Sequence, residues 1–147
     1  MLKYKEMTLE DIPTMTPLYV KTFNAPPWND TWTEKTAAKR LSQMIGVPDF
    51  YGLCAYDDEG LCGLILGGFE QYCDTVTFNL KEFCVRSTER GRGLGSRIYR
   101  ELEKRLNERD VSEILLYTLR GMQTQHFYNK QGFNDAEDMV LMKKMAV

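Results

Sequence analysis

Short apolar patterns of two different periods divide the chain into strands and helices. Alternating or continuous apolar runs predict strands over residues 2–7, 50–56, 61–72, 75–85, 112–119 and 139–145. Apolar residues at helical spacing predict helices over residues 8–23, 31–45 and 94–106, with a short one inside 122–133. The resulting order, β-α-α-β-β-β-α-β-α-β, predicts a mixed α/β sheet with a β-α-β crossover over residues 76–119.

Local signals support several of these boundaries. The stretch from Thr8 to Asp11 resembles a capped helix start, and Gly46 followed by Pro48 is typical of a helix end. The turn sequence at 57–60 joins two strands into a hairpin. The run over 112–119 has few polar interruptions, which predicts a strand covered on both faces.

Length and composition favour one soluble globular domain. With 147 residues, 43% of them hydrophobic and 27% charged, the chain is long enough for a single core, so residues 1–147 are expected to form one domain. No apolar run approaches the roughly 20 residues that cross a bilayer. Because the N-terminus carries charges where a signal peptide is apolar, we expect a cytoplasmic protein with no membrane partner.

Charge is unevenly distributed along the chain. Residues 86–109 hold eight basic and four acidic side chains, a net charge of +4 in a chain whose net charge is −2. The overall charge argues against general nucleic-acid binding. The basic segment instead favours a bound anion at 86–109 and a cationic second ligand elsewhere.

Cysteine and histidine usage gives no metal motif. The four cysteines, Cys54, Cys62, Cys73 and Cys84, form no Cys-x-x-Cys pair, and the chain has one histidine. A zinc site is therefore not expected. We expect all four to be reduced, buried, small hydrophobic residues.

A glycine-rich loop between the strand at 75–85 and the next helix carries the most specific signal. The six residues from Arg90 to Gly95 contain three glycines and two arginines. A strand, a glycine loop and a helix start together expose backbone N–H groups at the positive end of a helix dipole, which favours a phosphate group. The triphosphate-binding loop needs a Gly-Lys pair that this chain lacks. The dinucleotide fingerprint needs glycine or alanine where Ser96 stands.

The loop resembles the (Arg/Gln)-x-x-Gly-x-(Gly/Ala) loop of the GNAT superfamily of acyl-CoA-dependent N-acyltransferases. The sequence FYNKQGF at 127–133, about 33 residues downstream, is also similar to the family, as are the intervening helix and strands. The resemblance implies a central mixed, mostly antiparallel sheet of six to seven strands, flanked by about four helices and splayed between strands four and five. It also implies acetyl-CoA as co-substrate.

The resemblance implies which residues contact coenzyme A. In the family the loop grips the pyrophosphate, and the strand before it lies along the cofactor. The implied cofactor-binding residues are Phe83, Cys84, Val85, Arg90, Gly91, Arg92, Gly93, Leu94, Gly95, Ser96, Thr118 and Tyr128. Many relatives have an asparagine a few residues before the Phe-Tyr pair, where this chain has Gly121 or Thr124.

Acetyl transfer to an amine needs a base and an acid. Glu82, in the strand that enters the loop, is the first candidate base, and Glu70 on the neighbouring strand is the second. The resemblance implies that Tyr128 protonates the departing thiolate. The backbone N–H of Val85 or Cys84 is expected to stabilise the oxyanion.

The loop between the first two helices is the expected acceptor site. Aromatic faces and carboxylates suit a cation, and the candidate residues there are Trp28, Asp30 and Trp32, together with Glu70. We expect acetyl transfer to the primary amine of a small cationic molecule such as an aminoglycoside, a polyamine or an amino sugar. A protein or peptide N-acetyltransferase and a non-catalytic acyl-CoA-binding module stay open as alternatives, as does a homodimer.

Overall fold

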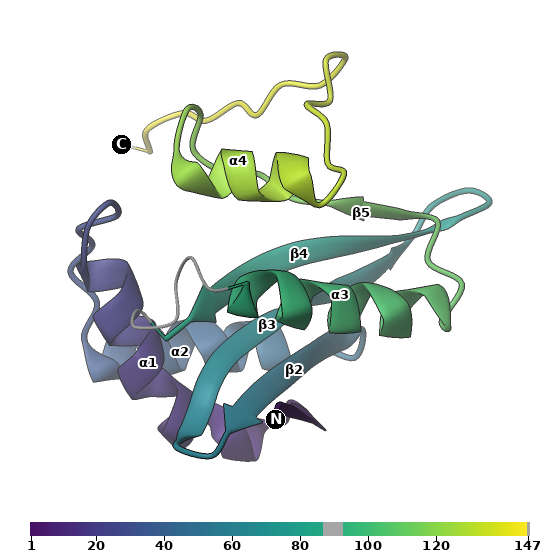
Figure 1. Cartoon of the computed structure of the whole chain (residues 1–147). Coiled ribbons are helices and arrows are strands. Elements are labelled where there is room, and N and C mark those ends of the chain that lie inside the picture. Colours follow the sequence, from purple (N-terminus) through teal and green to yellow (C-terminus); the bar gives the residue numbers. More distant parts are fainter. Residues whose placement is uncertain (87–92, 147) are drawn as a thin grey trace. The chain divides into compact units, whose positions relative to one another are not determined.

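The computed structural model describes residues 1–86 and 93–146. They fall into two compact units, Met1–Leu116 and Tyr117–Val147. The first unit holds one sheet with the strand order β1-β2-β3-β4-β5 (Figure 1). Its strands are β1 (Lys3–Glu6), β2 (Phe50–Asp57), β3 (Gly60–Gln71), β4 (Val76–Val85) and β5 (Glu113–Leu115). The first four pair antiparallel and β4 pairs with β5 in parallel. The predicted mixed, mostly antiparallel sheet is confirmed, with five strands among the described residues rather than six or seven.

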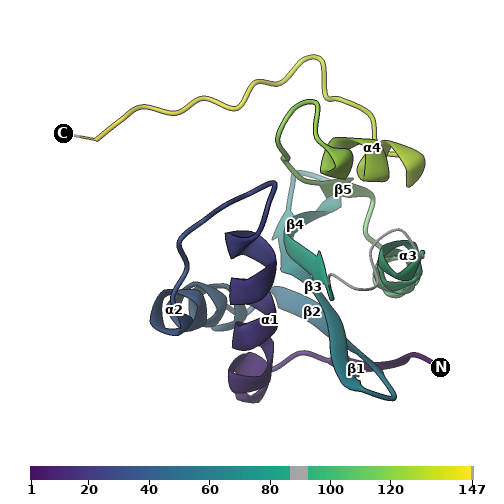
Figure 2. The same cartoon turned by 60° about the vertical axis from the view of Figure 1, so that its left-hand side comes forward.

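Helices cover both faces of this sheet. A single 3-10 turn, η1 (Leu9–Asp11), leads into α1 (Ile12–Asn24), which lies beside α2 (Glu34–Ile45) on one face, while α3 (Leu94–Asn107) covers the other (Figure 2). The capped start at Thr8 is confirmed: the backbone N–H of Thr8 donates to Asp11 Oδ2 at 2.7 Å. The N-cap of α2 is Thr33, and its C-cap is Gly46.

Two apolar layers hold the helices on the sheet. On the α1–α2 face, Met15, Tyr19 and Leu41 pack with residues of the strands such as Leu64 and Leu66. On the opposite face the predicted stripe of α3 is buried, and it consists of Leu94, Ile98, Leu102 and Leu106. Gly63 of β3 admits α3 closely, because a Cβ there would meet the end of Ile98 at 2.5 Å.

A β-bulge in β4 decides which face its second half presents. Gly67 of β3 pairs with Leu80, but the adjacent Leu66 pairs with Glu82, so Lys81 is the extra residue. Side chains two apart on a regular strand share a face, and one inserted residue reverses this relationship. Leu80 therefore shares the face of its partner Gly67, whereas Glu82 shares that of Leu66, which belongs to the α1–α2 core.

The fifth strand differs from the sequence prediction. The strand predicted over 112–119 is formed only at Glu113–Leu115, where Glu113 and Leu115 are exposed and Ile114 is half-buried. The expected coverage of both faces is therefore not found at these residues. Among the described residues, β5 pairs on one side only, with β4. Its ladder ends at Asn79 and Leu115, while β4 continues to Val85.

The second unit contains α4 (Gln123–Lys130) and an extended C-terminal segment. The strand predicted over 139–145 is wrong: residues 139–146 have no regular secondary structure, and their side chains are exposed. Strand propensity is realised only where a neighbouring strand supplies ladder hydrogen bonds, and the sheet of the described residues consists of β1 to β5.

The cysteines follow the expectation with one exception. All four are free, and Cys54, Cys62 and Cys84 are buried. Cys73 is exposed instead, because it lies in the turn between β3 and β4 rather than in a strand.

Candidate functional site

A buried carboxylate lies in the second half of β4. The bulge at Lys81 turns Glu82 toward α1 and α2, and Glu82 is only 9% exposed there. Tyr19 of α1 donates its hydroxyl to Glu82 Oε1 at 3.1 Å. Arg40 of α2 donates its Nε to the same oxygen at 2.6 Å. Residues from three elements thus meet at one carboxylate.

The loop between α1 and α2 places Trp32 against Arg40 of the Arg40–Glu82 ion pair. The Trp32 backbone N–H donates to Asn24 Oδ1 at 2.7 Å, and the Asn24 amide donates back to Trp32 O at 2.9 Å. The Trp32 indole N–H donates to Asp30 Oδ2 at 3.1 Å. The guanidinium of Arg40 lies over the Trp32 ring, 5.9 Å from its centroid, so the ring faces a cation of the protein itself.

Burial and charge act in opposite directions on Glu82. Removal of the carboxylate from water raises its pKa above the usual 4.5, and the charge of the exposed Asp30 adds to this rise. The hydrogen bonds and positive charge of Arg40, with the Tyr19 hydroxyl, offset part of it. Burial, and then the Glu82 charge, raise the pKa of Tyr19 itself, so that its hydroxyl stays a donor. The site therefore holds a carboxylate whose proton affinity exceeds that of a free one, as a general base requires.

An aromatic row extends from this carboxylate to the loop. The ring of Tyr19 contacts those of Phe23 and Trp32, with centroids 4.7 and 5.2 Å apart. Phe23 in turn contacts Trp28 edge-on at 5.1 Å. Of the three residues expected at the acceptor site, Trp32 contacts both Tyr19 and Arg40, the two donors to Glu82. Asp30 acts on Glu82 through its charge, and Trp28 lies further along the row, against Phe23.

Glu70 is not part of this cluster. It is exposed and pairs with Thr77, four residues along β3 from the Leu66 that faces Glu82. At about 3.3 Å per residue, that separation corresponds to roughly 13 Å of strand. The two candidate bases therefore lie in different surroundings.

The described part of the glycine loop begins a helix. Arg90, Gly91 and Arg92 lie outside the described residues. Gly93, with φ of +79°, is the N-cap of α3, and Arg97 N–H donates to its carbonyl at 3.1 Å. Leu94, Gly95 and Ser96 follow as the first residues of the helix. The N–H groups of the first helical turn point along the helix axis, away from the helix body. The start of α3 thus has the geometry that binds an anion.

The end of β4 leads into this loop. Arg86 N–H donates to Cys62 O of β3 at 2.7 Å. Since N–H groups alternate sides along a strand, Cys84 N–H is directed to β3 and Val85 N–H to the opposite edge. Phe83 and Val85 are half-buried and Cys84 is buried. Within the described residues, β5 does not pair with this part of that edge.

Two further predicted residues belong to the second unit. Tyr128 lies in α4, with its ring packed edge-on against those of Phe127 and Phe133 at 5.2 and 5.5 Å. Gly132, with φ of +99°, lets the chain turn so that Phe133 N–H donates to Tyr128 O at 3.0 Å. Thr118 and Thr124 share a hydroxyl hydrogen bond of 2.8 Å.

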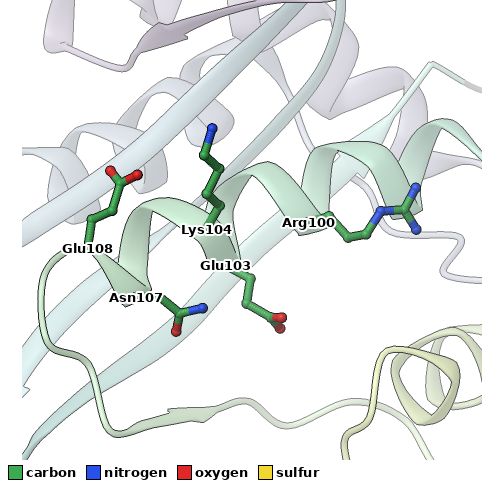
Figure 3. Close-up of a pocket in the computed structure, with 5 residues that line it drawn as sticks. All are labelled: Arg100, Glu103, Lys104, Asn107 and Glu108. Carbon is green, nitrogen blue, oxygen red and sulfur yellow. The ribbon is translucent and has the colours of Figure 1, made fainter.

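A surface hollow along α3 is a weaker candidate for a binding site. It has a volume of about 500 Å³ and is lined by Arg100, Glu103, Lys104, Asn107 and Glu108 (Figure 3). Two basic and two acidic side chains balance there, so the hollow prefers neither sign of charge. No cluster of His, Cys, Asp or Glu suited to a metal occurs among the described residues. In the same part of the chain, no helix combines the length and apolarity needed to span a membrane.

Tyr19 and Arg40 were not among the site residues predicted from the sequence. Tyr19 follows Met15 by four residues on the buried face of α1. In the sequence, this spacing is typical of an aromatic residue of the core. Arg40 precedes the buried Leu41 on a helix that carries three other charged residues, so it resembles an ordinary surface residue. Sequence separations of 63 and 42 residues from Glu82 gave no local signal for either contact.

A protein-family model matches most of this chain. The model of the family described as "Acetyltransferase (GNAT) family" matches residues 13–133. A search of curated proteins finds no match.

Solved structures with the same fold come from several sources. An integron cassette protein from the mobile metagenome of V. cholerae has a TM-score of 0.81 at 13% identity, covering 99% of this chain and 93% of that one. A ribosomal-protein-alanine N-acetyltransferase from Brucella melitensis biovar Abortus has a TM-score of 0.78 at 16% identity, covering 99% of this chain and 100% of that one. An aminoglycoside acetyltransferase from an uncultured soil metagenomic sample, in complex with sisomicin, has a TM-score of 0.72 at 13% identity. The match covers 99% of this chain and 96% of that one.

Proposed function

This chain is an N-acetyltransferase of the GNAT family, and we propose that it moves the acetyl group of acetyl-CoA to the primary amine of a small cationic molecule. The observation that carries this proposal is the buried Glu82, held between α1 and α2 beside Asp30 and an aromatic row. The family match runs from residue 13 to 133, across both compact units, which supports a single catalytic domain over residues 1–147.

The proposed cofactor site is the end of β4 with the start of α3. The left-handed Gly93 and the first N–H groups of α3 fit a pyrophosphate, and we assign the amides of Arg92 to Ser96 to it. When bound, acetyl-CoA supplies an activated acetyl thioester. The edge of β4 beyond Asn79 suits its pantetheine arm, which would lie along the strand as in β-strand addition. Phe83, Cys84 and Thr118 are the further proposed cofactor contacts.

Glu82 is the proposed base. An amine with a pKa near 10.4 is neutral in only about one molecule in 10³ at pH 7, which costs roughly 4 to 5 kcal/mol. Glu82 takes the ammonium proton, directly or through a water molecule, and frees the nitrogen lone pair to form the bond to the acetyl carbon. Glu70 stays the second candidate for this role.

Tyr128 is the proposed acid. It gives its phenol proton to the sulfur as the bond between that sulfur and the acetyl carbon breaks. Val85 N–H is the proposed donor to the oxyanion, because its direction along β4 is away from β3, unlike that of Cys84.

Asp30 and the tryptophans are the proposed acceptor site. The exposed carboxylate of Asp30 can bind a second cationic group of the acceptor, and Trp28 offers an aromatic wall. Because Arg40 already lies over Trp32, we assign Trp32 to holding Asp30 through its indole N–H.

The test is a panel of amines with purified protein and acetyl-CoA, read by release of free thiol. The panel contains an aminoglycoside, a polyamine, an amino sugar and a peptide with a free N-terminus and a lysine. Thiol release with a small cation supports the proposal. Release with the peptide alone favours a protein N-acetyltransferase, and binding of coenzyme A without any release favours a non-catalytic module.

A further inference from the structure

The two hydrogen bonds to Glu82 end on one of its two oxygens. Tyr19 Oη and Arg40 Nε both donate to Oε1, at 3.1 and 2.6 Å. No described residue donates to Oε2. A carboxylate has lone pairs on both oxygens, so the bonded Oε1 fixes the orientation of the group while Oε2 keeps its capacity to accept a proton.

The donors to Oε1 are themselves fixed. Tyr19 is 1% exposed, and its ring is packed between those of Phe23 and Trp32. The Arg40 side chain is 43% exposed, but the Trp32 ring lies beside its guanidinium, and Trp32 is locked to Asn24 by two hydrogen bonds. The orientation of Glu82 therefore depends on packing that reaches from α1 through the loop to α2.

We propose that Arg40 and Tyr19 are positioning residues that hold Glu82 by Oε1 and leave Oε2 as the oxygen that accepts the amine proton. This proposal rests on the proposed function, because it concerns the base of that reaction. The proton leaves the acceptor nitrogen for Oε2, the nitrogen bonds to the acetyl carbon, and the bond from that carbon to sulfur breaks. Arg40 and Tyr19 touch none of the reacting atoms and act only through Glu82.

The charges around Glu82 predict how each donor affects it. Tyr19 faces it from α1, Arg40 from α2, and Asp30 acts on it from the loop between them. On β3 its cross-strand neighbour is the apolar Leu66. Arg40 is the cation that opposes burial and the charge of Asp30. Without Arg40, the pKa of the carboxyl is expected to rise.

The direct test is a carbon-13 NMR titration of the Glu82 carboxyl in the whole protein, assigned with Glu82→Gln. Arg40→Met is expected to raise the titration midpoint by about one pH unit or more, and Arg40→Lys by less, since lysine restores the charge but not the planar donor. Tyr19→Phe, which keeps the ring and its packing, is expected to give a smaller rise. The matched control is Arg105→Met, which breaks the 2.8 Å pair of Arg105 with Glu101 on α3. It should leave the Glu82 midpoint unchanged.

Kinetics supply the second readout, with the best acceptor from the amine panel. Arg40→Met should move the acid limb of kcat/KM upward by the same interval as the NMR midpoint, with coenzyme A affinity within about twofold of the parent. An unchanged midpoint and acid limb in Arg40→Met overturn the positioning role. If Glu82→Gln keeps the acid limb of the parent, the proposed base itself is wrong. That failure is recognisable because it does not depend on any Arg40 variant.

Discussion

Glu82 pairs with Leu66 across the ladder of β3 and β4, one residue out of step with the pairing that precedes it. This single shift places a carboxylate on the face that α1 and α2 cover. Without the bulge, the alternation from Phe78 and Leu80 would direct Glu82 to the face covered by α3, away from both Tyr19 and Arg40.

The bulge predicts a strong effect of a methyl group at Gly67. A Cβ at Gly67 would overlap the backbone carbonyl of Asn79, so Gly67→Ala must displace β4 beside the bulge. We expect a loss of about 1–3 kcal/mol in the free energy of unfolding and a fall in acetyl transfer. Urea denaturation measures the first and thiol release the second.

The adjacent glycine is the control. A Cβ at Gly68 would lie 3.6 Å from Asp49 O, an ordinary contact, so Gly68→Ala should change stability by no more than about 0.5 kcal/mol. Equal effects of the two substitutions would contradict the assignment of close approach to Gly67.

The elements of the first unit could be predicted because their signals are local. The α3 stripe repeats every four residues, and Thr8 caps the first helical turn in the expected place. The surroundings of Glu82 could not be predicted in the same way. The bulge depends on cross-strand register, and the contacts with Tyr19 and Arg40 join elements 63 and 42 residues away.

The failed predictions share one physical cause. Residues 112–119 and 139–145 have strand-forming composition, yet only Glu113–Leu115 forms a strand. Composition measures the preference of a residue for a pleated surface, whereas a strand exists only where a partner supplies hydrogen bonds. The position of a chain segment at the edge of a sheet is not encoded in its own residues.

The Asp11 carboxylate is expected to stabilise η1, the turn that leads into α1, in a pH-dependent way. It accepts from Lys5 Nζ and from Thr8 N–H, each at 2.7 Å. Burial raises the pKa of Asp11, but the hydrogen bonds from Lys5 and Thr8 outweigh it, and the net pKa is below 3.8. Its stabilisation is therefore complete above pH 3.8 and lost as the pH falls through the lowered value.

Asp11→Asn should accordingly lower the free energy of unfolding by about 1–2 kcal/mol at neutral pH. The difference from the parent should narrow once the pH is below the pKa of Asp11, as measured by urea denaturation across the acid range. The exposed Asp58→Asn serves as control and should show neither effect. A difference that stays constant with pH would exclude the linkage.

Two substitutions at Gly93 should separate the effect of charge from that of shape at the proposed pyrophosphate site. Gly93→Asp places a carboxylate where the phosphates are expected, so coenzyme A binding should be lost in calorimetry. Gly93→Asn has the same shape without the charge, and asparagine tolerates the left-handed conformation that Gly93 adopts. It should retain most of the affinity. NAD and ATP should compete poorly, and equal binding by Gly93→Asp and the parent would contradict the loop assignment.

Tyr128→Phe removes one hydroxyl and little volume. Because its ring packs against Phe127 and Phe133, the phenylalanine should keep α4 intact and leave coenzyme A affinity unchanged. Turnover is expected to fall by about 10- to 10³-fold, the range for loss of a general acid. Phe133→Leu is a control for packing, since it alters the contact but keeps the phenol. Full activity of Tyr128→Phe would remove Tyr128 from the mechanism.

The pH dependence of turnover should identify the base. The carboxyl of Glu82 has a raised pKa, so kcat/KM of the parent should fall as the pH decreases through a value above 4.5. Glu82→Gln should lose most activity at neutral pH and recover much of it at higher pH, where the amine deprotonates without help. Glu70→Gln removes an exposed carboxylate outside the cluster and should leave the profile unchanged. If Glu70→Gln shows the alkaline rescue and Glu82→Gln does not, Glu70 is the base. If both variants keep the acid limb of the parent, neither glutamate accepts the proton, and catalysis then rests on the alignment of amine and thioester alone.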